Sequence, residues 1–383
     1  MPGKKQNKKQ SGIPAKFILA IALVIVATLF FTVGKKFIGY ELEYRKDQKR
    51  ITSIFGNKLS VDLKEEIKYP IKSYALPRSP CWLAAGSGVA NYLEPDIDAA
   101  TFVFYGTPTL YMGGRNKNER HGYGLSWIRA FNNLGYTVYY ASTNPEHPPQ
   151  NVYPDIAPEN MIYFKNYEEE VLFLKKLLSG GFIPIIGADR SGLGFSDGGG
   201  DFVAVAGYNK EGLWLVFPNP KELAVEVPLT DPPKITESRF IPNKQFKQVF
   251  KGNRQLFWLD KTNERKSPEK IYEENKKNAQ EVAANMERTK EYLLGGGDPI
   301  HVTDVTEIPA AVGLYNYFKG KNELLSGQYL KIAETQRDLL KSFNYSETEL
   351  LRHPNKLSDA FDKIIPLAQE TARTWQKQSN LSF

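Results

Sequence analysis

The feature that most restricts this 383-residue chain is an uninterrupted apolar run from Phe17 to Val33. The run has no charged residue, and only Thr28 and Thr32 carry polar side chains. As a helix it would be roughly 25 Å long, which is the short end of what a bilayer core accepts. Because a helix satisfies its own backbone hydrogen bonds in lipid, we expect one transmembrane helix over residues 17–33.

Two other interpretations of this run stay open, namely a cleaved secretory signal and a buried core helix. A signal peptide also joins a basic start to an apolar stretch, but no small-x-small cleavage pattern follows before Lys35. Lysines flank the run on both sides, so the count of positive charges on the two sides is nearly balanced and gives little information on orientation. Long domains translocate largely regardless of charge. We expect a single-pass membrane protein with a basic cytoplasmic tail over 1–16 and the bulk of the chain extracytoplasmic.

Part of the net charge of +7 comes from basic residues on both sides of this run. These residues are compatible with contact with anionic membrane lipids and equally with a solvated tail. The chain has no arginine-rich stripe, zinc-finger spacing or RNA-binding aromatic motif, so we expect no nucleic-acid partner.

Pattern changes divide the rest of the chain into three parts. Residues 34–60 are polar and indicate a juxtamembrane stalk, residues 61–262 mix helix and strand patterns, and residues 263–383 have helix patterns alone. In the mixed part we expect three helices, over 82–93, around 125–134 and 166–179, before an antiparallel sheet, which is an α+β order. The predicted strands are 137–140, 182–187, 202–208, 213–217 and 256–259.

The last part is predicted to be an all-α helical domain. Ser267 and Pro268 suit the start of its first helix, because proline is favoured at the first helical position. The final helix has one apolar stripe, formed by Phe361, Ile364, Ile365, Ala368, Ala372 and Trp375.

Cys81 is the one cysteine, so no internal disulfide can form. It follows Pro80 at the start of a predicted helix, where the helix dipole and free backbone N–H groups would lower the pKa of its thiol. A reactive nucleophile and an inert, small, buried residue are both compatible with this position. The small residues that follow it, 84–88, would let another segment approach closely.

Two segments around this cysteine resemble a known family. PCWLAAGSGVANYL at 80–93 and DFVAVAGYNKEGLWLVFPNP at 201–220 together resemble papain-like cysteine peptidases of the bacteriocin-processing, double-glycine leader type. The resemblance covers about residues 61–260 and implies a papain-like cysteine peptidase fold there. It also implies that Cys81 takes the nucleophile position, Asn219 the orienting position and Asp201 the general-base position.

Asp201 departs from the family, which has histidine at this position. A carboxyl group with a reference pKa of about 3.9 is a poor proton donor at neutral pH, and its charge would raise the pKa of the thiol. The glutamine that supplies an oxyanion-hole donor in the family is Ala75 here. We assign none of the four histidines of the chain as a replacement for the missing general base: His121, His147, His301 and His353.

The glycine-rich segment 187–201 has no Gly-Lys-Ser/Thr ending of a phosphate-binding loop. Asp197 and Asp201 could share a cation, but their spacing matches no calcium loop, so we expect a loop beside the cleft, with no metal and no cofactor.

Three functions are compatible with these sequence features. We favour a catalytically degenerate cysteine peptidase-like protein that binds a peptide or protein ligand. The alternatives are an active thiol hydrolase, either a peptidase or an acyltransferase, that uses Cys81 with an altered dyad, and a structural surface protein.

Overall fold

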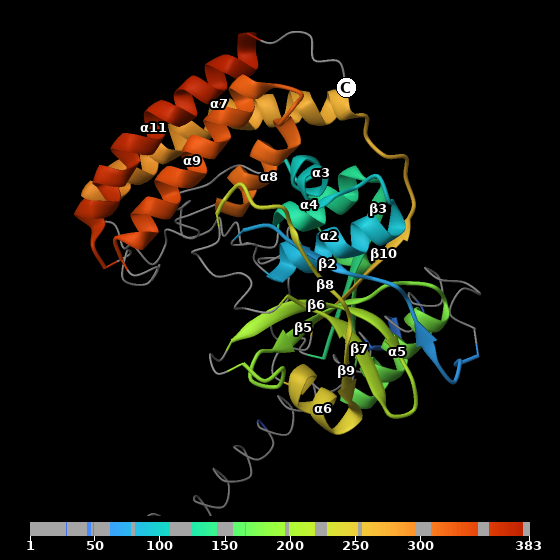
Figure 1. Ribbon diagram of the computed structural model, residues 1–383. Helices are drawn as coiled ribbons and strands as arrows, with labels where there is room; N and C mark the ends of the chain where they lie inside the picture. The colour runs from blue at the N-terminus through green and yellow to red at the C-terminus, as the bar shows by residue number, and fades with distance from the viewer. Residues whose placement is uncertain are drawn as a thin grey trace, which may run out of the picture. The chain divides into compact units, whose positions relative to one another are not determined.

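The computed structural model describes Thr28 and residues 44–46, 49, 62–77, 81–107, 125–143, 156–164, 166–195, 199–218, 228–251, 255–295, 308–343 and 352–377. Contacts divide the chain into two compact units, Met1–Gly56 and Asn57–Phe383. The described residues of the first unit are helical. Among the described residues, every strand and labelled helix lies in the second unit (Figure 1).

The expected transmembrane helix, and the single-pass extracytoplasmic localisation drawn from it, are contradicted. Among the residues that the structure describes, no helix has both the length and the apolar composition needed to cross a membrane. Three long helices, α7 (Pro268–Leu294), α9 (Glu323–Lys341) and α11 (Pro354–Lys377), carry many charged side chains, which are costly in hydrocarbon. Apart from Thr28, the run 17–33 lies outside the described residues.

The second unit is α+β and is built on a mixed sheet. The sheet has the strand order β4-β3-β10-β5-β6-β7-β9, with β1 paired to β6, and β2 pairs with β8 separately. Among the described strands, β3 and β4 pair in parallel and the other pairs are antiparallel, and β4 was not among the expected strands. The strands are β1 (Ile67–Lys68), β2 (Ser73–Ala75), β3 (Tyr136–Ser142), β4 (Met161–Tyr163), β5 (Ile185–Asp189), β6 (Gly200–Tyr208), β7 (Gly212–Val216), β8 (Lys234–Thr236), β9 (Arg239–Pro242) and β10 (Gln255–Lys261).

Helices cover both faces of this sheet. Successive residues of a strand point to opposite faces, and Phe257 and Trp258 of β10 therefore identify the two layers. The ring of Phe257 lies 5.1 Å from that of Trp127 in α4 (Leu125–Asn133). The ring of Trp258 lies 5.2 Å from that of Phe173 in α5 (Tyr167–Ser179). The other helices of this part are α2 (Cys81–Leu93), α3 (Ala99–Tyr105) and α6 (Asn243–Lys251), with a short 3₁₀ turn, η3 (Pro158–Asn160).

Several of these elements have signals within a short stretch of sequence. Asn166 caps α5, because its side-chain oxygen accepts a hydrogen bond of 2.9 Å from the backbone N–H of Glu169. The turn between β6 and β7 is a hairpin, closed by a 3.0 Å bond from the N–H of Asn209 to the carbonyl of Gly212. The α7 helix begins at Pro268.

The remaining helices, α7, α8 (Ile308–Phe318), α9 and α11, pack together after β10. The predicted apolar stripe of α11 is buried, and the indole N–H of Trp375 donates a 2.8 Å hydrogen bond to the hydroxyl of Tyr329. This helical part meets the mixed part at α3, where the rings of Phe104 and Tyr317 stack with centroids 3.8 Å apart. The expected domain boundary near 262 stays a prediction.

Candidate functional site

The candidate site lies at the N-terminus of α2, where Cys81 is the first helical residue. Small residues in this helix allow another segment to cross it closely. A Cβ atom added at Gly88 would lie 2.1 Å from the carbonyl oxygen of Lys72, just before β2. The hydroxyl of Ser87 donates a 3.1 Å bond to the carbonyl of Tyr74 in β2. The predicted close approach is therefore present, and it holds α2 in place.

The thiol of Cys81 lies against the beginning of β6. It is hydrogen-bonded to the Asp201 side chain, and the backbone N–H groups of Trp82 and Phe202 donate to its sulfur. Burial and the negative charge of Asp201 raise the pKa of Cys81 to about 12, although both N–H groups act to lower it. Some of the cysteine surface remains exposed. The arrangement therefore favours a protonated thiol.

Arg190 completes this cluster. Its Nε atom lies 3.6 Å from Oδ2 of Asp201, and the two side chains are 24% and 17% exposed. The carboxylate of Asp201 is therefore shared between a neutral thiol and a guanidinium.

The loop that joins β5 to β6 is ordered by its own backbone bonds where the structure describes it. The carboxylate of Asp189 accepts hydrogen bonds from the backbone N–H groups of Ser191, at 2.8 Å, and Gly192, at 3.4 Å. The pKa of Asp189 lies below its usual value mainly because the Ser191 hydroxyl also donates to its carboxylate. The two backbone bonds lower this pKa further. Asp197, the other residue considered for a shared cation, lies outside the described residues.

Of the other residues considered for this site, the described ones add no catalytic group to the cluster. Ala75 ends β2 as a buried residue without a side-chain donor. His353 lies in the helical part, with its ring 5.5 Å from that of Phe343. Three histidines and the orienting position lie outside the described residues: His121, His147, His301 and Asn219.

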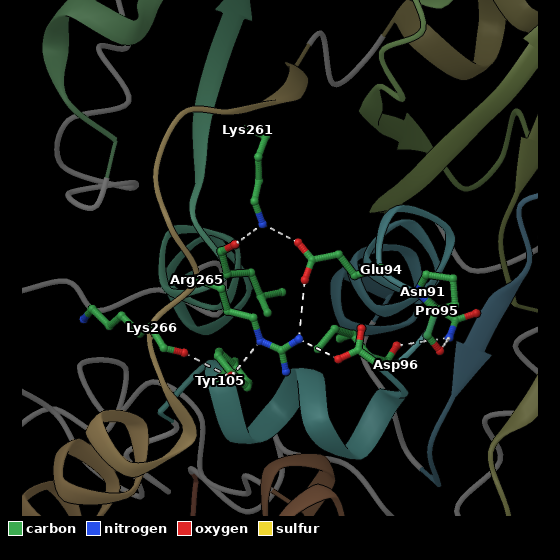
Figure 2. A network of polar contacts seen from close by, with 10 residues as sticks. Asn91, Glu94, Pro95, Asp96, Tyr105, Lys261, Arg265 and Lys266 are labelled. Atoms are coloured by element: carbon green, nitrogen blue, oxygen red, sulfur yellow. Dashed lines mark hydrogen bonds and ion pairs between the residues drawn. The ribbon is translucent and has the colours of Figure 1, made fainter.

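A polar network at the other end of α2 is a second feature, which no sequence pattern indicated (Figure 2). Glu94, just beyond α2, is paired with Lys261 of β10 and lies 3.5 Å from the guanidinium of Arg265. Arg265 also bonds to Asp96 at 2.6 Å and to the hydroxyl of Tyr105 at 2.8 Å. The network therefore fixes the end of α2 to the segment that leads into α7.

No protein-family model matches this chain, and no curated protein matches it either. We therefore infer function from the geometry of Cys81, Asp201 and Arg190.

Proposed function

We propose that this protein is a catalytically silent, cysteine peptidase-like binding protein whose site around Cys81 receives a peptide or protein segment without cleaving it. The observation that carries the proposal is the hydrogen bond between Asp201 and the Cys81 thiol. By the resemblance, an active peptidase would have a histidine at this position.

A cysteine nucleophile attacks as a thiolate, and its base must then protonate the leaving amine. Because burial and the charge of Asp201 raise the pKa of the Cys81 thiol to about 12, this side chain is almost entirely protonated at pH 7. An aspartate, with a reference pKa of about 3.9, is also a poor proton donor at this pH. Ala75 adds no side-chain donor that would stabilise an oxyanion. Both halves of peptidase chemistry are therefore disfavoured.

The first experiment measures the rate of iodoacetamide labelling against pH. Because Cys81 is the sole cysteine, labelling reports on this thiol alone. We expect the rate at pH 7 to be no higher than that of N-acetylcysteine, and to keep rising up to the most alkaline pH at which the protein stays folded. A thiol that titrates below pH 7 would overturn the proposal and support the active hydrolase.

The second experiment tests binding. Peptides selected on this protein from a displayed random library should protect Cys81 from alkylation, because they would occupy the surface around it. Protein that already carries a bulky maleimide adduct at Cys81 should lose these peptides. A library that yields no protecting peptide would contradict the binding half of the proposal.

A further inference from the structure

The position of Arg190 follows from the pairing of β5 with β6. Ala188 lies opposite Asp201 in this antiparallel ladder, and Asp189 lies opposite Gly200. The backbone N–H of Arg190 then donates a 2.9 Å hydrogen bond to the carbonyl of Gly199, which extends the ladder by one step. The pairing of β5 with β6 therefore places Arg190 beside Asp201.

A second contact holds the guanidinium of Arg190. Its central carbon lies 5.7 Å from the centroid of the Phe195 ring. The loop places this ring, because the N–H of Phe195 donates a 3.0 Å bond to the carbonyl of Arg190. The Phe195 ring also meets the Phe217 ring edge-on at 5.9 Å. An aromatic ring and a carboxylate therefore both restrain this cation.

We infer that Arg190 is a positioning residue that holds the carboxylate of Asp201 beside Cys81, and that it is a second barrier to thiol activation. The inference rests on the proposed function. A reactive dyad needs a thiolate beside an imidazolium. A histidine placed at position 201 would have the Arg190 guanidinium as its neighbour, and a like charge at this range disfavours the protonated imidazole. Asp201→His alone would therefore restore reactivity only in part.

The test compares the pH dependence of iodoacetamide labelling in the parent, Arg190→Gln, Asp201→His and the double variant. We expect Arg190→Gln alone to label no faster than the parent, because it removes a cation without supplying a base. Asp201→His should label faster than the parent. The double variant should label about tenfold faster than Asp201→His at pH 7, because the protonated imidazole beside the thiolate no longer meets a like charge.

Arg337→Gln combined with Asp201→His is the matched control. Arg337 is 29% exposed and lies in α9, paired at 3.8 Å with Asp338, so its loss removes the same charge away from the thiol. This control should behave as Asp201→His alone. Circular dichroism and thermal unfolding of every variant should establish that all of them are folded.

The outcomes separate the two claims. A parent thiol that titrates below pH 7 overturns the proposed function. A normal parent together with equal profiles for Asp201→His and the double variant overturns only the role of Arg190.

Discussion

The side-chain amide of Asn275 in α7 donates a 3.0 Å hydrogen bond to the backbone carbonyl of Phe104 in α3. The same amide donates to the carbonyl of Ile271, one turn earlier in its own helix. Asn275 is buried, and the contact joins the helical part to the layer that contains α2 and α4. The two parts are therefore joined by a specific polar bond as well as by the stacked rings of Phe104 and Tyr317.

We expect Asn275→Ala to lower the free energy of unfolding by about 1–3 kcal/mol, because a buried carbonyl loses a donor. Asn316→Ala is the matched control, since this part-buried amide bonds within its helix to the carbonyl of Val312, at 2.9 Å. The control should stay within about 0.5 kcal/mol of the parent. Urea unfolding gives both values, and equal losses would mean that the bond between α7 and α3 contributes nothing of its own.

Alanine substitutions at two helical glycines should have opposite effects on stability. A Cβ atom at Gly313 of α8 would lie 2.6 Å from three side-chain atoms of Val103 in α3, whereas one at Gly327 of α9 would meet nothing within 4 Å. We expect Gly313→Ala to destabilise the fold by about 1–3 kcal/mol through overpacking. Gly327→Ala should stabilise it by about 0.5–1 kcal/mol, because alanine is the better helix former. Thermal unfolding of both variants measures the signs, and a stabilised Gly313→Ala would contradict close packing of α8 on α3.

The network in Figure 2 predicts a pH-dependent contribution from Asp96. The hydrogen bond from Arg265 holds the pKa of Asp96 below its usual value. A carboxyl group with a lowered pKa in the folded state stabilises the fold above its unfolded pKa of about 3.9, and this stabilisation is lost as the pH falls through the folded value.

Asp96→Asn should therefore cost up to about 1 kcal/mol at pH 6–7, a small value because the Asp96 side chain is 64% exposed and its ion pair is screened. The difference from the parent should vanish near pH 2.5. Denaturant unfolding at both pH values tests this, with Asp359→Asn in α11 as a control outside the network. A difference that persists in acid would assign the effect to something other than the charge of Asp96.

Local structure was largely predictable from the sequence where one short segment contains its own signal. The cap at Asn166, the turn at Asn209 and the start of α7 at Pro268 each depend on residues within a few positions, and the structure has all three. The buried stripe of α11 follows from helical spacing in the same way. The parallel pairing of β4 with β3 was not predictable, because a three-residue strand has too little pattern to specify a partner.

The sequence by itself determined that Cys81 opens a helix and that Asp201 stands near the start of a strand, because helix and strand periodicity are local. Only the tertiary structure decided that Asp201 bonds to the Cys81 thiol and that Arg190 pairs with Asp201. The sequence did contain a hint that Arg190 and Asp201 are neighbours, because they flank the same hairpin loop. Once the pairing register is known, they lie close together across the two strands. That register depends on which faces of β5 and β6 are buried, and burial is a property of the whole packed sheet. The charge environment of the thiol was therefore decided by packing between distant segments, which no single stretch of sequence encodes.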